Sequence, residues 1–172
     1  MAPTSLPLLL LLTMFISSHS QLGGELKQTT LSYYFQDRPS GPNATTLTIT
    51  GITGRQWNYT SFGSVLATDD SMTETFDRNS AEIGRGQAVL VNSAFDGSTF
   101  TLLMSIVFTS KEYKGSTLQI QGADRQFESP RESAVVGGTG KFRFARGYVT
   151  FETFHVEKYY DVVRCNISVQ HY

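Results

Sequence analysis

Short apolar stretches with a two-residue period are the feature that most limits what this chain can fold into. Apolar and aromatic residues alternate with polar ones over a few positions at a time, and Gly, Pro, Asn and Asp interrupt each run. No convincing stretch carries apolar residues at helical spacing, so the pattern predicts an all-β protein. Strands are predicted at residues 29–37, 45–52, 61–69, 86–93, 99–110, 116–123, 132–136, 141–154 and 161–171. The polar residues 71–82 are predicted to form a long loop.

The predicted strands form one domain, residues 21–172, because the sequence contains no internal repeat and no obvious linker. Closing about eight short antiparallel strands into a single β-barrel removes exposed edges and can leave a ligand pocket in the centre or at one mouth. In the last predicted strand, alternation places Cys165 inward among aliphatic residues and Asn166 outward. Residues 99–110 are apolar on one face and partly so on the other, which indicates that a neighbouring subunit covers the outer face.

The N-terminus has the features of a secretory signal peptide. Residues 6–16 are apolar, too few to span a bilayer, and the small polar residues after them predict cleavage after Ser20. Sequons for N-glycosylation follow at Asn43, Asn58 and Asn166. We therefore expect residues 1–20 to be removed and the mature protein to be a secreted, extracellular glycoprotein without a membrane segment. The only cysteine, Cys165, permits no internal disulfide and is interpreted as a small buried hydrophobic residue.

Several functional classes are disfavoured by what the sequence lacks. The 14 Lys and Arg residues balance 15 Asp and Glu residues without a basic cluster, so we do not expect a nucleic-acid partner. After the signal peptide only His155 and His171 remain beside one cysteine, so no metal site and no cofactor are expected. The glycine-rich residues 137–141 are predicted to form a tight turn rather than a phosphate loop. The carboxylates of residues 69–77 are interpreted as a solvated surface.

Two constellations remain as candidate sites. Alternation in the first strand places Tyr33, Phe35 and Asp37 on one face. Asp37 then either lies in an aromatic pocket or caps the turn before Pro39. The second constellation is Asp124 with Arg131, seven residues later. This pair is either a surface ion pair of little energetic value or an acid held in a partly buried barrel mouth.

The sequence resembles the dirigent family along nearly its whole mature length. The matching segments are Tyr34–Asp37, Gly41–Thr45, Glu82–Gln87, Tyr113–Leu118, Gly122–Asp124, Arg131–Glu132, Val135–Tyr148 and His171–Tyr172. Several such segments in the right order are a specific signal, and they are most similar to the large subgroup of dirigent-like proteins. One position departs from the family pattern, which usually has His before the first aspartate, where this chain has Gln36.

The resemblance implies an antiparallel eight-stranded barrel that forms a homotrimer in the plant apoplast or cell wall. It also implies that the family's polar pocket residues correspond to Asp37, Asp124 and Arg131, which would be the catalytic groups. Tyr33 and Phe35, which share a strand face with Asp37, are then expected to line the pocket. A separate laccase or peroxidase makes phenoxy radicals for such proteins, and the barrel binds these small phenolics without oxidising them. Some relatives instead dehydrate a closed-shell phenolic through a quinone methide and close a ring.

Three functions therefore remain open. The first is a dirigent protein that imposes stereoselectivity on radical coupling of coniferyl-alcohol-type monolignols to optically active lignans. The second is a cyclising lyase resembling a pterocarpan synthase, which needs no oxidase. The third is non-catalytic binding of phenolics in cell-wall deposition or defence. The first two functions share their chemistry: an acid assists the quinone methide oxygen, and the protein orients the attacking hydroxyl.

Overall fold

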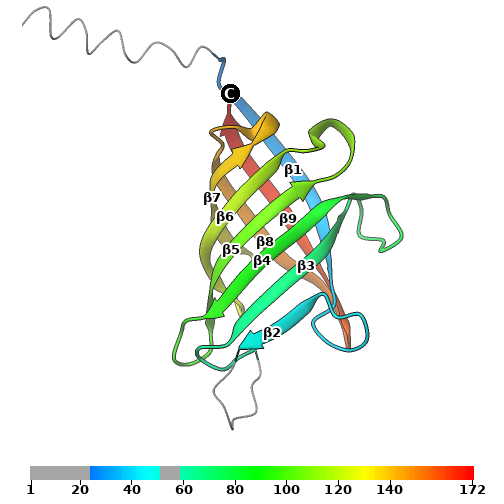
Figure 1. Ribbon diagram of the computed structural model, residues 1–172, viewed down its shortest axis with the longest axis vertical. Helices are drawn as coiled ribbons and strands as arrows, with labels where there is room; N and C mark the ends of the chain where they lie inside the picture. Colours follow the sequence, from blue (N-terminus) through cyan, green and yellow to red (C-terminus); the bar gives the residue numbers. More distant parts are fainter. Residues whose placement is uncertain (1–23, 51–58) are drawn as a thin grey trace, which may run out of the picture.

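Nine antiparallel strands and two short 3₁₀ turns make up the computed structural model, which describes residues 24–50 and 59–172 (Figure 1). The strands are β1 (Lys27–Asp37), β2 (Thr46–Thr50), β3 (Val65–Thr73), β4 (Glu82–Asn92), β5 (Thr99–Phe108), β6 (Thr117–Arg125), β7 (Arg131–Thr139), β8 (Arg146–Glu157) and β9 (Tyr160–His171). The 3₁₀ turns are η1 (Lys111–Tyr113) and η2 (Gly140–Phe142). No helix of the described residues is long and apolar enough to cross a membrane.

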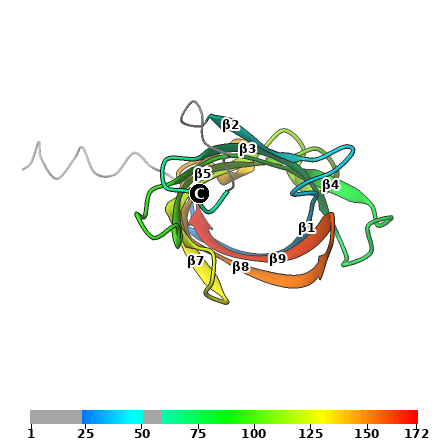
Figure 2. The same ribbon diagram turned by 90° about the horizontal axis from the view of Figure 1, so that it is seen from below.

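The sheet closes on itself through its first and third strands. Its order is β1-β9-β8-β7-β6-β5-β4-β3-β2, and β1 also pairs with β3 from Tyr34 opposite Thr73 to Gln36 opposite Ser71. Strands β1 and β3–β9 thus form a closed eight-stranded barrel, seen end-on in Figure 2, and β2 is an extra strand along the first half of β3. The predicted all-β fold with an antiparallel eight-stranded barrel is confirmed.

One end of the barrel is plugged by aromatic side chains. The ring of Phe142, at the end of η2, lies 5.4 Å from that of Phe108 and 4.9 Å from that of Tyr113, measured between centroids. Gly138 permits this close approach of η2, because a Cβ at residue 138 would lie 2.5 Å from the carbonyl oxygen of Phe142. Since this end, near the C-terminus, is filled, open volume is left toward the other end of the barrel.

The inner side chains follow the predicted alternation. In β9 Cys165, Ile167 and Val169 are buried, whereas Asn166 faces outward and accepts a hydrogen bond from the Ser32 hydroxyl at 2.7 Å. In β5 Phe100, Leu102, Ile106 and Phe108 on the inner face are buried, while Leu103 on the outer face is half exposed. The two-residue period therefore predicted correctly which side chains form the core of these strands.

Several predicted boundaries were wrong. Strand β3 runs from Val65 to Thr73 instead of over residues 61–69, and β4 begins at Glu82 instead of at residue 86. Only residues 74–81 therefore form the loop before β4. Gly137 and Gly138 belong to β7 rather than to a turn, and the turn is η2, entered through Gly140 with a φ of 61°. Strand β8 accordingly begins at Arg146 instead of at residue 141. In β3 the error arose because the inward-facing residues Thr68 and Asp70 are polar, which hides the strand period.

Candidate functional site

A cavity of about 780 Å³ occupies the end of the barrel opposite the aromatic plug. It opens between the β1–β2 loop, the β6–β7 turn and the β8–β9 turn, which contribute Pro39, Gln126 and Lys158 to its lining. Its apolar lining consists of Phe35, Leu66, Leu90, Phe100, Leu102, Met104, Phe151 and Val163, among others. This volume and this apolar lining suit a small organic molecule, and the few polar groups set how such a molecule is oriented.

One wall of the cavity carries two carboxyl groups, from the half-buried Asp37 at the end of β1 and the buried Asp70 in β3. The Thr46 hydroxyl donates to Asp37 Oδ1 at 2.9 Å, and the Thr68 hydroxyl donates to Asp70 Oδ2 at 2.7 Å. Burial raises the pKa of Asp37, against the effect of its threonine hydrogen bonds. Burial and the charge of Asp37 together raise the pKa of Asp70 to about 7. At neutral or mildly acidic pH this wall therefore holds an available proton.

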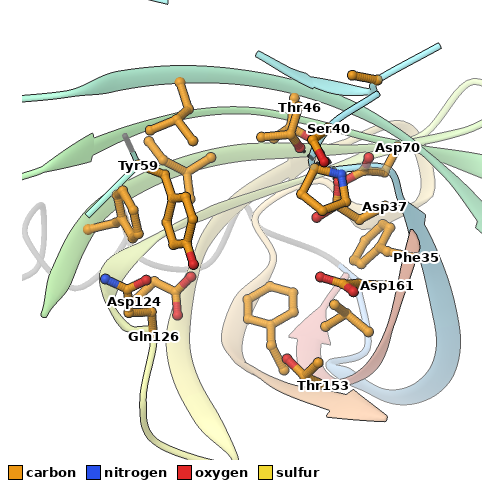
Figure 3. A pocket seen from close by; sticks show the side chains of 18 of the residues that line it. Phe35, Asp37, Ser40, Thr46, Tyr59, Asp70, Asp124, Gln126, Thr153 and Asp161 are labelled. Atoms are coloured by element: carbon orange, nitrogen blue, oxygen red, sulfur yellow. Dashed lines mark hydrogen bonds between the residues drawn. The ribbon is translucent and has the colours of Figure 1, made fainter. Parts of the chain in front are cut away.

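A third carboxyl group, that of Asp161, lies on the same side of the cavity (Figure 3). Asp161 is opposite Asp37 in the pairing of β9 with β1. Its Oδ1 atom is buried and has no hydrogen-bond partner among the described residues. Burial, followed by the nearby charge of Asp37, raises the pKa of Asp161.

Asp124, which forms an ion pair with Arg131, lies across the cavity from these carboxyls (Figure 3 shows Asp124). The distance from Arg131 Nε to Asp124 Oδ1 is 2.8 Å, and only 12% of the arginine and 16% of the aspartate side chain is exposed. Arg131 also donates to the Thr153 hydroxyl at 3.1 Å. Burial raises the pKa of Asp124, and the positive charge of Arg131 opposes this shift. Of the two interpretations of this pair, the structure favours the acid in a partly buried mouth.

The structure brings together four of the five predicted catalytic and pocket residues. Phe35, Asp37, Asp124 and Arg131 all line the cavity. Tyr33 was predicted to line it too, but this was wrong: its ring packs against Phe108, at a centroid distance of 6.2 Å, among the core side chains. The reason is position along the strand, because two residues advance a strand by about 7 Å, here toward the plugged end.

Phe35 owes its place in the cavity wall to a glycine on β4. A Cβ at Gly86 would lie 2.6 Å from the Phe35 ring, so a larger residue there would displace the ring. The ring of Phe35 lies 6.3 Å from that of Phe151, which lines the same cavity. The segment Glu82–Gln87, which the sequence shares with the dirigent pattern, thus shapes the pocket from β4.

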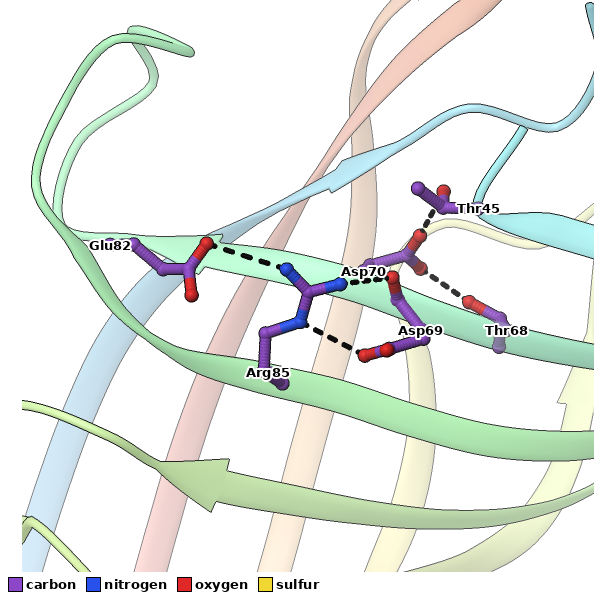
Figure 4. A network of polar contacts seen from close by, with 6 residues as sticks. All are labelled: Thr45, Thr68, Asp69, Asp70, Glu82 and Arg85. Atoms are coloured by element: carbon purple, nitrogen blue, oxygen red, sulfur yellow. Dashed lines mark hydrogen bonds and ion pairs between the residues drawn. The ribbon is translucent and has the colours of Figure 1, made fainter. Parts of the chain in front are cut away.

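Asp70 is the main site residue that the sequence did not reveal. It was assigned to a solvated surface with Asp69, Glu74 and Asp77, but only 7% of Asp70 is exposed. Its neighbour Asp69 does point outward, where Arg85 Nε contacts Asp69 Oδ1 at 2.9 Å (Figure 4). The alternation of Leu66, Thr68, Asp70 and Met72 was the available signal, because those four side chains are all buried.

Gln36 lies on the opposite face of β1 from Phe35 and is not a cavity residue. The side chain is only 4% exposed and contacts Thr73 and Tyr160. Its Nε2 donates to the Thr73 hydroxyl at 2.7 Å, and the Tyr160 hydroxyl donates to its Oε1. The position at which this chain departs from the family's histidine therefore lies outside the cavity lining.

We expect Gln36→Leu to lower the free energy of unfolding by about 1–3 kcal/mol, since it leaves the Tyr160 hydroxyl without this partner. Gln28→Leu is the matched control, because Gln28 lies on the same face of β1 and is exposed. That change should stay within about 0.5 kcal/mol of wild type. Urea denaturation of both variants measures the difference. Equal effects of the two substitutions would contradict a structural role for the Gln36 hydrogen bonds.

The glycosylation sequons have different surroundings. Asn43 is exposed in the β1–β2 loop, with a left-handed φ of 64°. Asn166 is half-buried on the outer face of β9. Asn58 and the predicted signal peptide lie outside the described residues.

The chemistry available in the cavity is proton transfer and orientation of oxygen atoms. Cys165 is fully buried, and burial raises the pKa of its thiol far above the usual range, so it is no nucleophile. No group of three or more His, Cys, Asp or Glu side chains in residues 24–50 and 59–172 could hold a metal ion. Carboxyls on opposite walls, one arginine and an aromatic lining define a small-molecule-binding β-barrel equipped for acid–base chemistry.

Comparison with known proteins identifies the family. The model of the Dirigent-like protein family matches residues 28–170, and the chain belongs to this family. It is 35% identical to Dirigent protein 1 of Arabidopsis thaliana, over 84% of this chain and 80% of that protein. It is 34% identical to Pterocarpan synthase 1 of Glycyrrhiza echinata, over 86% of this chain and 80% of that protein. The solved structure of the pterocarpan synthase dirigent protein GePTS1 superposes with a TM-score of 0.79 at 34% identity, covering 87% of this chain and 88% of that one.

Proposed function

We propose that this chain binds a phenolic compound in its barrel and directs bond formation at a quinone methide toward one stereoisomer. The observation that carries the proposal is the placement of protonatable carboxyls on two facing walls of one largely apolar cavity. A quinone methide is an electrophile whose carbonyl oxygen gains basicity as a hydroxyl attacks its methide carbon. A proton donor near that oxygen therefore lowers the barrier, typically by a factor of about 10²–10⁴.

The two walls have different parts in this proposal. Asp124 exchanges a proton with the phenolic oxygen, while Arg131 orients the carboxyl and holds that oxygen through its donor fork. The carboxyls of Asp37 and Asp70 lie where they can serve the other end of the reacting group. Phe35 and Phe151 provide the apolar surface against which an aromatic ring packs. Holding both reacting ends fixes which face of the methide carbon is attacked.

For a closed-shell phenolic the atoms balance as a dehydration. Asp124 takes the phenol proton while the opposite carboxyls protonate a benzylic hydroxyl, which leaves as water with the electron pair of the broken C–O bond. An internal hydroxyl then attacks the methide carbon and forms the new C–O bond. Its proton returns to the opposite carboxyls, and Asp124 returns its proton to the phenolic oxygen. The net change is loss of one water and closure of one ring, with no electron transferred to the protein.

The source of the quinone methide separates two candidate functions. Similarity to pterocarpan synthases and the raised pKa of Asp70 favour the dehydrating, ring-closing route. Similarity to Dirigent protein 1 supports the second candidate, in which a laccase or peroxidase makes radicals of coniferyl-alcohol-type monolignols. In that case the barrel would orient two radicals, and the coupled quinone methide would close to an optically active lignan.

A phenolic panel with and without an oxidase tests the proposal. Substrates carrying a benzylic and an internal hydroxyl should give one enantiomer of a ring-closed product without oxidase, as read by chiral chromatography. If coniferyl alcohol with laccase yields the only optically active product, the second candidate is correct. Oxygen uptake by the protein alone with coniferyl alcohol should equal the blank. Absence of any chiral product in both arms would leave only non-catalytic binding in wall deposition or defence.

The cellular setting belongs to the same proposal. We propose a secreted glycoprotein of the apoplast that assembles as a homotrimer. The signal-peptide pattern of residues 1–20 and the exposed Asn43 support export and glycosylation. Val89 and Leu103 lie opposite each other on the outer face of β4 and β5, 41% and 51% exposed, which supports burial of this face by another subunit.

For the secreted protein we expect an N-terminus at or near Gln21 and N-glycans at Asn43 and Asn166, with Asn58 as a further acceptor. The reason is that export passes the chain through the compartment where sequons are modified. Peptide mass spectrometry after enzymatic deglycosylation should find aspartate in place of asparagine at the occupied sites. Recovery of an unglycosylated protein that retains residues 6–16 would refute export.

A further inference from the structure

The hydroxyl of Thr45 lies between the two carboxyls of the Asp37–Asp70 wall. Thr45 Oγ1 is 2.5 Å from Asp70 Oδ1 and 3.4 Å from Asp37 Oδ1 (Figure 4 shows its contact with Asp70). The same oxygen accepts a hydrogen bond from the Arg38 backbone N–H at 2.8 Å. Both backbone groups of Thr45 are also bound, the N–H to the Arg38 carbonyl and the carbonyl to the Asp69 N–H, each at 3.0 Å. The hydroxyl is therefore held in place between the carboxyls.

Counting hydrogens at this oxygen shows what it can satisfy. A threonine hydroxyl has one hydrogen and two lone pairs, and the Arg38 N–H occupies one lone pair. One hydrogen and one lone pair remain for two carboxyl groups. If both carboxyls are ionised, the remaining lone pair faces a second negative oxygen, which is repulsive. If Asp70 is protonated, it donates to Thr45 and Thr45 donates to Asp37, so that every hydrogen and lone pair is used.

Two further threonine hydroxyls bind the pair. Thr46 donates to Asp37 Oδ1, the same oxygen that faces Thr45, and Thr68 donates to Asp70 Oδ2, so each carboxyl already accepts one hydroxyl hydrogen. No positively charged side chain forms an ion pair with either carboxyl among the described residues. The separation of 2.5 Å between Thr45 Oγ1 and Asp70 Oδ1 lies at the short end of the range for O–H···O bonds, so Asp70 is the closer of the two carboxyls to this hydroxyl.

We propose that Asp37 and Asp70 share a single proton through the Thr45 hydroxyl and act together as one acid, with Thr45 as the positioning residue. This inference rests on the proposed function for its role in the reaction. In the dehydrating route the pair donates its one proton to the departing hydroxyl and regains one proton from the attacking hydroxyl. Asp70 becomes a catalytic residue in addition to Asp37, Asp124 and Arg131.

Other charged groups around the pair set its charge balance. Asp161 on β9 lies opposite Asp37 and adds negative potential, which favours retention of the shared proton. From β4, Arg85 acts in the other direction, but it is bound outside the barrel to Asp69 and Glu82 (Figure 4). Glu157 at the end of β8, Lys158 in the β8–β9 turn, and Asp124 with Arg131 on the far wall also line the cavity.

The shared proton can be measured without any substrate. In ¹³C-carboxyl NMR titration of the wild-type protein, Asp37 and Asp70 should ionise in two separated steps, the upper one near pH 7. Thr45→Val should bring the two ionisation steps about one pH unit closer together. This corresponds to a tenfold change in the ratio of the two proton affinities of the pair. Thr45→Ser keeps the hydroxyl and should retain the wild-type separation. Asp37→Asn should leave Asp70 with a single step at lower pH, because the neighbouring charge is gone.

Two controls separate this effect from glycosylation and from the catalytic proposal. Thr45→Val also destroys the sequon at Asn43, whereas Asn43→Gln removes the sequon and leaves the Thr45 hydroxyl in place. The carboxyls of Asn43→Gln should therefore titrate as in wild type.

Two results would overturn the shared proton. One is an unchanged distance in pH between the two ionisation steps in Thr45→Val. The other is an unchanged ionisation step of Asp70 in Asp37→Asn. If the titrations behave as expected but no phenolic is converted, the proposed function fails and the shared proton stands. If the two carboxyls titrate independently but product forms normally, the shared proton fails and the proposed function stands.

Discussion

Asp124→Asn should abolish most of the stereodirected product while the protein folds normally. The substitution keeps the size of the side chain but removes the group that exchanges a proton with the phenolic oxygen. Loss of a general acid–base group typically costs about 10²–10⁴-fold in rate. The measurement is the initial rate and enantiomeric excess of product by chiral chromatography, on whichever substrate the panel identifies. If radicals are supplied by an oxidase, they should still be consumed, with racemic coupling in solution.

Arg131 should behave as part of the same unit. Arg131→Ala removes the donor that orients Asp124 and contacts Thr153, so we expect a loss similar to that of Asp124→Asn. The double variant should be no worse than the more damaging single variant, because groups that act together are not additive. Additive losses would show that the two residues act independently.

Asp69→Asn is the matched control for this experiment. It makes the same chemical change on the outside of the barrel, where the Asp69 side chain is 55% exposed and paired with Arg85. We expect wild-type rate and enantiomeric excess. If Asp124→Asn folds normally and also retains full enantiomeric excess, the Asp124–Arg131 pair is structural and the site assignment is wrong.

The second large effect concerns stability and its dependence on pH. Asp70 has a pKa of about 7 in the folded protein, whereas a carboxyl in an unfolded chain has one of about 4. The folded state therefore favours the protonated form. Its contribution to stability is fully present below pH 4 and is lost as the pH rises through 7. Integrated over this window, ionising Asp70 costs the fold up to about 4 kcal/mol.

Asp70→Asn removes this titration, so the variant should become more stable relative to wild type as the pH rises. We expect the difference in unfolding free energy between variant and wild type to change by about 2–3 kcal/mol between pH 5 and pH 8. Urea denaturation at both pH values measures it. The same variant should no longer form the stereodirected product. Asp70 would then support activity at the expense of stability.

Asp69→Asn again provides the comparison, since it removes an adjacent but outward-facing carboxyl. Its difference from wild type should stay nearly constant over the same pH range. A pH-independent difference for Asp70→Asn would mean that Asp70 is ionised at pH 5 in the folded protein. In that case the wall could not hold the proton that the proposed chemistry needs.

The sequence alone was sufficient for much of the fold. Alternation along β1 predicted that Phe35 and Asp37 share one face, and alternation along β9 predicted that Cys165 faces inward and Asn166 outward, because side-chain direction in a strand depends only on residue parity. The resemblance to the dirigent family also indicated Asp37, Asp124 and Arg131, all of which line the cavity. Tyr33 shares this parity but lies outside the cavity, because parity does not tell how far along the barrel the open volume extends.

Only the tertiary structure decided which polar groups contact one another and how far each of them is buried from solvent. Asp70 reaches Asp37 because β3 closes the barrel against β1, and Thr45 reaches both because the β1–β2 loop folds back over β3. The aromatic plug around Phe142 confines the cavity to the opposite end of the barrel. Burial of a carboxyl is the sum of contacts from strands distant in sequence, and this burial raises its pKa. Local pattern therefore determines the direction of a side chain, whereas its acidity follows from the closed barrel.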